Sequence, residues 1–336
     1  MKRFNVAVVG ATGAVGQELL KILAERDFPV ADLKMLATER SAGKKIEFKG
    51  QEYVVEPTTG EAFRGVDIAF FAGGSASKDF AREAAKRGAV VIDNSSAFRM
   101  DPDVPLVVPE VNPEDVKLHK GIIANPNCST IIMVVVLKPI HDAAKIKRVV
   151  VSTYQAVSGA GKEAIDELAA QVKQLSMGND VTPEVFPYQI AFNLIPQIDV
   201  FSDLDYTKEE WKMVHETRKI MHDDKMEITA TTVRVPIFRS HSESVNIETE
   251  QKLSAAEAKR LLAGAPGVIV QDDIAKKEYP MPLFASDKDE VFVGRIREDN
   301  SIGSGLNLWV VADQLRKGAA TNAVQIAELV VKYNCF

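Results

Sequence analysis

Cys128 is the residue in this chain best suited to covalent chemistry, and its neighbours decide whether it does any. The chain has 336 residues and two cysteines, of which Cys335 is penultimate. Cys128 lies in ANPNCST (124–130), where the Asn-Pro-Asn segment is typical of a turn. Branched apolar residues follow, and periodicity alone does not assign them to a strand or a helix. A helix beginning near Cys128 would stabilise a thiolate, whereas a lone cysteine is more often an inert buried residue.

A glycine-rich turn near the N-terminus predicts that the chain binds a dinucleotide. Glycines separate an apolar run at 4–9 from a helical pattern at 17–26, spaced as G-x-x-G-x-x-G. In this strand–turn–helix context the backbone can approach a pyrophosphate, whose charge then lies at the helix N-terminus. The alternative is a purely structural turn. We expect the dinucleotide to contact Gly10, Thr12, Gly13, Ala14, Val15 and Gly16.

The segment LATERSAGKK (36–45), at the end of the second expected strand, bears on the type of cofactor. Glu39 could accept a hydrogen bond from the ribose 2′-hydroxyl of NAD. Arg40 and Ser41 instead suit a 2′-phosphate, and we therefore favour NADP(H). A thiol and a hydride carrier in one chain indicate one reaction class: a cysteine adds to an aldehyde, hydride leaves, and a thioester results.

The order of elements predicts an α/β fold with two domains. Apolar runs and helical patterns alternate in the first third, as in a parallel sheet with helices on both faces. Later segments alternate apolar and polar residues, which is typical of antiparallel strands: 148–157, 228–236, 244–251, 291–299 and 305–313. We predict a Rossmann-type NADP-binding domain over 1–127, with a helix at 314–336 packing back on it. An α+β catalytic and dimerisation domain with a mostly antiparallel sheet should cover 128–313.

Composition excludes several classes of partner. Hydrophobic residues make up 46% of the chain, charged residues 26%, and the formal net charge is -6. No Lys/Arg block suggests a nucleic-acid surface. No apolar run approaches the ~20 residues that span a bilayer, and the N-terminal apolar stretch is too short for a signal peptide. Two distant cysteines suggest neither a disulfide framework nor a metal site. We expect a cytoplasmic protein that binds neither nucleic acid nor a membrane.

Ordered blocks from the first strand to the last helix resemble the aspartate-semialdehyde dehydrogenase family. They are GATGAVGQELL, DNSSAFRM, ANPNCST, STYQAVSGAG, EEWK, RVPIFRSHS and QLRKGAATNAVQIAE. The resemblance implies reversible NADPH-dependent reduction of L-aspartyl-4-phosphate to L-aspartate 4-semialdehyde, with release of phosphate. This reaction belongs to lysine, threonine and methionine biosynthesis. The family forms dimers or tetramers, and we expect a homodimer, with a tetramer as the alternative.

The resemblance also assigns catalytic roles. Cys128 matches the acyl-thioester nucleophile, His241 the acid/base that takes the thiol proton, and Gln155 the residue that orients the substrate. Arg234 matches the arginine that grips the substrate α-carboxylate. In one extended strand Arg234 and His241 would point to opposite faces, so we expect a turn or bulge between them.

Further matches concern the phosphate, the substrate amine and the nicotinamide. Arg99, Asn127 and Lys212 match the phosphate-binding group, and Glu209 matches the contact to the amine. Ser158 and Gly159 match a loop on the nicotinamide side, and Gln314 stands where the family usually has asparagine.

Three other interpretations compete with the resemblance to aspartate-semialdehyde dehydrogenases. Glyceraldehyde-phosphate dehydrogenases resemble S-C-T-T around the nucleophile, and N-acetyl-glutamyl-phosphate reductases resemble G-C-Y, whereas this chain has N-C-S-T. A non-enzymatic NADP-binding paralogue would be expected to lose the thiol or the histidine, and this chain keeps both.

Overall fold

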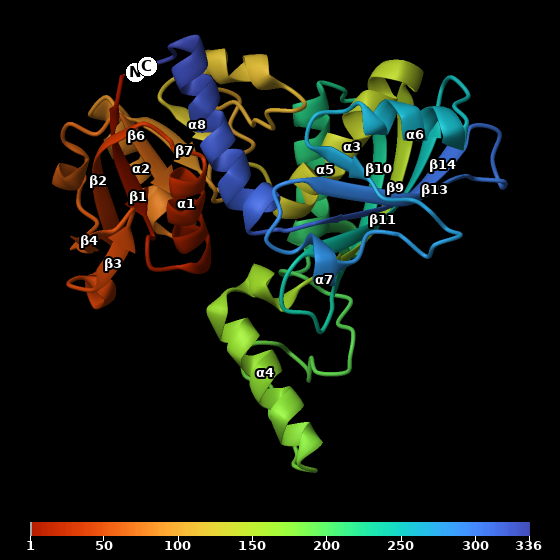
Figure 1. Ribbon diagram of the computed structural model, residues 1–336, viewed down its shortest axis with the longest axis horizontal. Helices are drawn as coiled ribbons and strands as arrows, with labels where there is room; N and C mark the ends of the chain where they lie inside the picture. Colours follow the sequence, from red (N-terminus) through yellow and green to blue (C-terminus); the bar gives the residue numbers. More distant parts are fainter. Residues whose placement is uncertain (1) are drawn as a thin grey trace. The chain divides into compact units, whose positions relative to one another are not determined.

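The computed structural model describes residues 2–336, which form two compact units (Figure 1). One unit comprises the chain up to Asn127 together with Ala319–Phe336, and the other comprises Cys128–Gly318. The division therefore falls between Asn127 and Cys128, inside the stretch that carries the candidate nucleophile.

The first unit contains a parallel sheet with helices on both faces, which confirms the predicted Rossmann-type architecture. Its strand order is β5-β2-β1-β6-β7-β8, and every pair is parallel. The strands are β1 (Phe4–Val9), β2 (Val30–Ala37), β5 (Glu56–Pro57), β6 (Ile68–Phe71), β7 (Val90–Asp93) and β8 (Ile122–Ala124). A separate hairpin pairs β3 (Lys45–Phe48) with β4 (Gln51–Val54).

Helices α1 (Ala14–Glu25) and α8 (Thr321–Tyr333) share one hydrophobic core with the sheet of this unit. That core includes Val6 and Val8 of β1, which lie two residues apart and therefore point to the same face of the sheet. Phe70 of β6 pairs with Val8 and belongs to the same core. Helix α2 (Ala76–Lys86) packs against β6 and β7 outside this cluster. The predicted C-terminal helix begins only at Thr321, because a π-helical turn, Arg316–Ala320, precedes it.

The turn between β1 and α1 requires glycine at two of its three glycine positions. Gly10 has φ +83°, a conformation that side chains other than glycine rarely adopt. A Cβ on Gly16 would lie 2.2 Å from the carbonyl oxygen of Gly10, so α1 approaches the turn too closely for any side chain there. These contacts keep the N-terminus of α1 against the end of β1, as dinucleotide-binding turns do.

The second unit contains a mixed six-stranded sheet in the order β10-β9-β11-β14-β13-β12. Its strands are β9 (Ile146–Gln155), β10 (Glu227–Arg234), β11 (His241–Thr249), β12 (Val268–Val270), β13 (Val291–Glu298) and β14 (Gly305–Ala312). The central pairs are antiparallel, as predicted, whereas β10–β9 and β12–β13 at the edges are parallel. The parallel edges arise because helical segments separate the paired strands in sequence and return the chain in the same direction.

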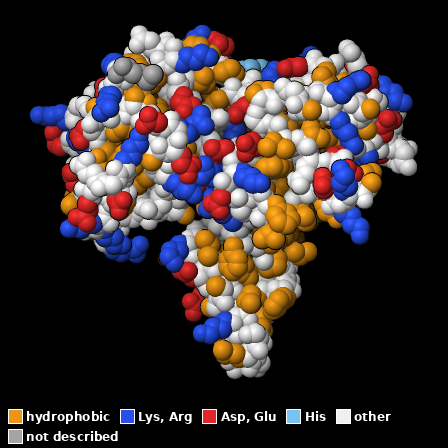
Figure 2. Space-filling model, in the orientation of Figure 1, with side chains coloured by type: hydrophobic (Ala, Val, Ile, Leu, Met, Phe, Trp, Pro, Cys, Tyr) orange, Lys and Arg blue, Asp and Glu red, His pale blue; other side chains and the backbone are white. Residues whose placement is uncertain are grey.

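One face of this sheet is covered by α3 (Cys128–Ala144), α5 (Lys208–Met221) and α6 (Ala255–Ala263), as Figure 1 shows. Helix α4 (Lys162–Ser176) projects from the unit, and Figure 2 shows apolar side chains gathered over this projection. Within residues 2–336 no helix combines the length and the apolar character needed to cross a membrane.

The glycine contacts generate a stability prediction. Gly16→Ala should lower the free energy of unfolding by about 2 kcal/mol, because the new methyl group forces α1 away from the turn. Gly13→Ala is the matched control, since a Cβ there would lie 3.4 Å from the Gly10 oxygen, an ordinary contact. Urea denaturation of both variants measures the difference, and equal losses would show that the close approach at Gly16 is not a constraint.

Candidate active site

Cys128 is the first residue of α3, which confirms that a helix begins at the candidate nucleophile. The first turn of α3 contains no acidic residue, and the N–H groups of a first turn have no partner within their own helix. These groups and the helix dipole stabilise a thiolate at this position. Backbone packs tightly beside the thiol, because a Cβ on Gly318 would lie 3.0 Å from that of Cys128. Neither cysteine forms a disulfide.

Arg234, Gln155 and His241 lie side by side on the helix-covered face of the sheet, and we call them the upper row. Arg234 of β10 pairs with Gln155 at the end of β9. The register of β11 against β9 brings His241 to the level of Gln155. The chain turns between β10 and β11, with Ser240 at φ +71°, which confirms the turn expected between Arg234 and His241.

Hydrogen bonds connect Gln155 to α3 and α5, and Arg234 to the backbone after β9. The Nε2 of Gln155 donates to Ser129 Oγ at 2.7 Å and to Glu209 Oε1 at 3.3 Å. Arg234 Nη1 donates to the carbonyl oxygen of Ala156 at 2.7 Å. The Ser129 contact was not predicted, although Ser129 directly follows Cys128 in the sequence. Gln155 is therefore anchored one residue from the thiol.

Gly159, predicted to border the nicotinamide, lies against the upper row. A Cβ at this position would be 2.9 Å from Arg234 Nη1 and 3.4 Å from His241 Nε2. The absence of a side chain keeps the space beside these two nitrogens open. Arg234 Nη1 and His241 Nε2 therefore both border the backbone of Gly159, although the two side chains come from different strands.

Arg234 links the thiol electrostatically to the rest of the site. Burial lowers the pKa of Arg234, while the negative charges of Glu209 and of a Cys128 thiolate act in the opposite direction. The guanidinium therefore lies within electrostatic range of both groups, and a cation at this position favours the thiolate over the thiol.

His241 is neutral in this structure, and its hydrogen bond identifies the tautomer. Complete burial, followed by the charge of Arg234, lowers the pKa of His241 to about 3. Its Nδ1 accepts the N–H of Ala156 at 3.1 Å, so the ring hydrogen resides on Nε2. That Nε2 is buried and has no hydrogen-bond partner among residues 2–336. In this tautomer Nε2 carries the hydrogen and acts as a donor. Nε2 can accept a proton only in the other tautomer, in which Nδ1 carries the hydrogen and no longer accepts from Ala156.

Glu209 and Lys212 lie three residues apart on one face of α5, and Asp199 contacts Lys212 beside them. Lys212 Nζ donates to Glu209 at 3.0 Å and to Asp199 at 2.9 Å. Burial opposes the charge on Lys212, but the two carboxylates outweigh burial and raise the pKa of Lys212. Asp199 was not predicted, because it lies in a long irregular segment with φ +68° and carries no motif.

Gln314 and Ser158 are in direct contact in the second unit. The Gln314 Nε2 donates to Ser158 Oγ, and its Oε1 accepts the N–H of Ser240 at 2.7 Å. Both ends of the amide are used, so the chain retains the function of an amide where the family usually has asparagine. Ser240 directly precedes His241, and Gln314 thus holds both the predicted cofactor loop and the turn that begins β11.

In the first unit, Arg99 is buried and holds the segment that ends at Asn127. Its Nε donates to the carbonyl oxygen of Asn125 at 3.0 Å and its Nη2 to that of Asn94 at 2.8 Å. The side chain of Asn125 accepts the amide of Asn322, on α8, at 2.7 Å. These asparagines were not predicted, although all three lie within blocks that carried the resemblance. The C-terminal helix therefore braces the residues just before the nucleophile.

The cofactor residues predicted in the first unit gather at the carboxyl ends of β1 and β2. Thr12 Oγ1, in the glycine turn, donates to Ser41 Oγ at 3.4 Å, and Arg40 beside it is exposed. Gly10 with φ +83° and the close approach of α1 at Gly16 form the tight strand–turn–helix that dinucleotide sites use, so these residues fit a dinucleotide. Within residues 2–336 no group of three or more His, Cys, Asp or Glu side chains could hold a metal ion.

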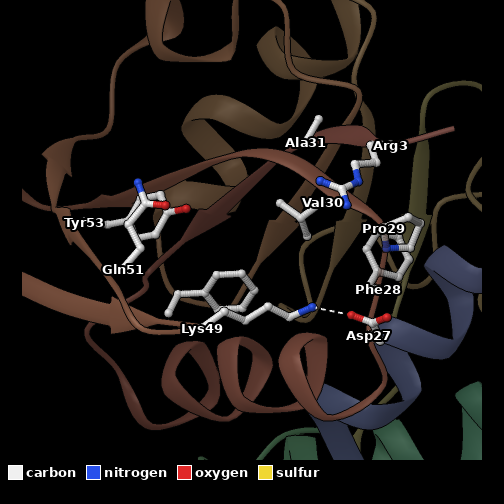
Figure 3. Close-up of a pocket in the computed structure, with 10 residues that line it drawn as sticks. Arg3, Asp27, Phe28, Pro29, Val30, Ala31, Lys49, Gln51 and Tyr53 are labelled. Atoms are coloured by element: carbon white, nitrogen blue, oxygen red, sulfur yellow. Dashed lines mark hydrogen bonds and ion pairs between the residues drawn. The ribbon is translucent and has the colours of Figure 1, made fainter. Parts of the chain in front are cut away.

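A cavity of about 460 Å³ in the first unit lies at the other end of the parallel strands, where β1 and β2 begin (Figure 3). Its lining includes Arg3, just before β1, Val30, at the start of β2, and Tyr53 of the hairpin. Lys49 spans it to reach Asp27 at 2.5 Å. Dinucleotides bind at the carboxyl ends of parallel strands, so this cavity is not the cofactor site.

The low pKa of His241 predicts a pH dependence of stability. The unfolded ring binds a proton below pH 6.5, whereas the folded ring remains neutral down to about pH 3. Between pH 7 and pH 5 this group should therefore reduce the free energy of unfolding by roughly 2 kcal/mol. His241→Asn should lose that part of the dependence in denaturant titrations at the two pH values. Identical pH dependence in the wild type and the variant would contradict the burial of a neutral ring.

Comparison with known proteins agrees with this arrangement. Residues 5–119 match the family model described as semialdehyde dehydrogenase, NAD binding domain, and residues 137–317 match semialdehyde dehydrogenase, dimerisation domain. The aspartate-semialdehyde dehydrogenase of Aquifex aeolicus is 62% identical over 334 residues, covering 98% of both chains. That of Bacillus subtilis is 56% identical over 339 residues, with 98% of each covered.

Solved structures agree in fold over the same length. The crystal structure of aspartate semialdehyde dehydrogenase II from Vibrio cholerae superposes with a TM-score of 0.96 at 52% identity, covering 98% of this chain and 99% of that one. Another Vibrio cholerae structure, described as complexed with ASA, has a TM-score of 0.96 at 51% identity, covering 99% of both chains. The chain belongs to the aspartate-semialdehyde dehydrogenase family.

Proposed function

We propose that the protein catalyses the reversible NADPH-dependent reduction of L-aspartyl-4-phosphate to L-aspartate 4-semialdehyde and phosphate. One observation carries this proposal: a cysteine at a helix N-terminus lies within electrostatic range of Arg234, in the row that also presents Gln155 and His241. The relatives named aspartate-semialdehyde dehydrogenase support the substrate, and the Vibrio cholerae relative is described with ASA bound.

In this proposal Cys128 carries the acyl group. The thiolate attacks C4 of aspartyl phosphate, the bond from C4 to the phosphate oxygen breaks, and a thioester remains. When bound, the reduced cofactor supplies the hydride that converts the thioester to the aldehyde, and the thiolate is released. The first turn of α3 and the charge of Arg234 keep Cys128 in the form that attacks and leaves.

We assign each group of the substrate to different charged side chains. Arg234 has further guanidinium N–H groups beyond the one bonded to Ala156, and these suit the α-carboxylate. Glu209, held between Gln155 and Lys212, suits the α-ammonium group. We assign the phosphate to Arg99, Asn127 and Lys212, a set of two cations and one amide.

His241 is proposed as the acid/base residue, and its geometry sharpens that role. The Nε2–H can donate a hydrogen bond to the oxygen on which negative charge develops when hydride reaches the thioester. Accepting the thiol proton requires the other tautomer, so the ring must exchange the Ala156 contact for another at that step.

The oligomer is proposed to be a homodimer. The matched dimerisation domain supports this, as do large apolar side chains exposed in the segment that follows α4: Tyr188, Phe192, Leu194, Phe201 and Leu204. Figure 2 shows the apolar surface of this projection. A role in lysine, threonine and methionine biosynthesis, in the cytoplasm, follows from the family resemblance.

Substitution of the nucleophile tests the proposed activity. Wild-type protein should reduce NADP in the presence of aspartate semialdehyde and phosphate, and Cys128→Ala should lower kcat by at least about 10⁴-fold, because the acyl carrier is gone. Cys335→Ala is the matched control and should retain the wild-type rate. Full activity in Cys128→Ala, or faster turnover of N-acetylglutamate semialdehyde by the wild type, would refute the proposal.

Cofactor choice is tested at the end of β2. We propose NADP(H), because Arg40 and Ser41 can bind a 2′-phosphate and Ser41 contacts the glycine turn through Thr12. Arg40→Glu should reduce kcat/KM for NADP by about 10-fold or more while changing that for NAD little, since it replaces an attraction for phosphate by a repulsion. Lys45→Glu, in the nearby hairpin, controls for a general change of charge. A higher kcat/KM with NAD than with NADP in the wild type would contradict the assignment of a 2′-phosphate site to Arg40 and Ser41.

A further inference from the structure

A second polar row lies directly beneath the upper row, on the same face of the sheet. Thr153 of β9 pairs with Thr232 of β10 on one side and with Glu243 of β11 on the other. Each lies two residues along its strand from a member of the upper row, and therefore points to the same face. We call Thr232, Thr153 and Glu243 the lower row.

The lower row is buried, and the residues that the structure describes offer its side-chain oxygens no hydrogen-bond partner. Thr153, Thr232 and Glu243 are each 0% exposed. Both threonine hydroxyls and both carboxyl oxygens of Glu243 form no hydrogen bond with any of residues 2–336. These oxygens account for most of the buried, unpartnered side-chain atoms in the part of the chain that the structure describes, and they lie in one row.

The surroundings of the lower row are apolar. The next position along each strand on the same face is Ala230, Val151 or Val245. Helix α3 covers β9 and β11, and its residues from Ile131 to Leu137 are apolar and buried. Burial raises the pKa of Glu243 well above its usual range. The side chain is therefore a neutral acid that offers one O–H donor as well as acceptors.

Buried oxygens without partners are strongly unfavourable, and water is the remaining partner available to them. Neighbouring strands lie about 4.8 Å apart, which exceeds a direct hydrogen bond but suits two oxygens joined through one water molecule. An internal water needs two to four polar partners, and the lower row supplies hydroxyl and carboxyl groups from three adjacent strands.

We propose that the lower row holds internal water beneath the upper row, and that Glu243 acts through this water as a positioning residue for His241 and Gln155. Water is bound by the hydroxyls of Thr153 and Thr232 and by the carboxylic acid of Glu243. His241 lies two residues from Glu243 on the same strand, and its buried Nε2 also lacks a partner. The water site stands on the lower row alone, whereas the positioning role rests on the proposed function.

The first test is structural and does not depend on activity. A high-resolution crystal structure of the wild-type protein should show ordered water within hydrogen-bond distance of Glu243 and of at least one of the two threonine hydroxyls. Glu243→Gln keeps a donor and an acceptor and should retain that water, whereas Glu243→Met should lose it. A dry lower row in the wild type, or a direct bond from Glu243 to another side chain, would overturn the water site.

The second test measures the positioning role. Glu243→Met should lower kcat by about 10-fold with KM for aspartate semialdehyde unchanged, and Glu243→Gln should restore kcat to near the wild-type value. Thr153→Val removes one hydroxyl with little change of shape and gives the same comparison should Glu243→Met fail to fold. Thr217→Val is the control, because Thr217 is equally buried and unpartnered but lies on α5, outside the row.

The two tests fail in different ways. Unchanged kcat in Glu243→Met, or an equal loss of kcat in Thr217→Val, would overturn the positioning role. The water site would still be decided by the crystal structure. Absence of aspartate-semialdehyde dehydrogenase activity in the wild type would refute the proposed function, and with it the positioning role, but not the water site.

Discussion

The pairing of β9 with β10 and β11 is the constraint on which the candidate site depends. Arg234, Gln155 and His241 come from three strands, and they share one face only in the register that the structure has. A shift of one residue in either pairing would turn a member of the upper row to the opposite face. Hydrogen bonds along the full length of these strands therefore determine which side chains share this face of the sheet.

Helix α3 contributes to the candidate site through its N-terminus and not through its side, because Cys128 is its first residue and Ser129 in its first turn binds Gln155 of the upper row. The helix is apolar along most of its length and is held by the core, so the position of Cys128 follows from packing. Charge near the thiol is arranged in pairs: Arg234 lies near Glu209, and Glu209 and Asp199 bind Lys212. Buried charges require such partners, and a substrate with a carboxylate and an ammonium group can exchange with them without leaving any charge unpaired.

Local patterns predicted much of this, and tertiary contacts account for the rest. The glycine turn and the long alternating strands each follow from a short stretch of sequence, whereas periodicity left both a strand and a helix open for the segment after Cys128. Asp199 could not be predicted, because it lies in an irregular segment that carries no motif. The bond between Asn322 and Asn125 could not be predicted, because the two residues lie 197 positions apart in the chain. Glu243 did leave a signal: it occupies an inward position in the alternation His241, Glu243, Val245, Ile247, where an apolar residue is expected. The parallel edges of the second sheet depend on the crossover of whole helices, which alternation within a strand does not reveal.

Cys128 is proposed to carry the substrate acyl group, and trapping that intermediate tests this role most directly. The enzyme would be mixed with aspartyl phosphate in the absence of reduced cofactor, quenched in acid, digested and analysed by mass spectrometry. We predict one aspartyl group attached to the peptide that contains Cys128, with one equivalent of phosphate released for each acylated subunit. Phosphate release without an acylated peptide, or an acyl group on any other residue, would contradict the account.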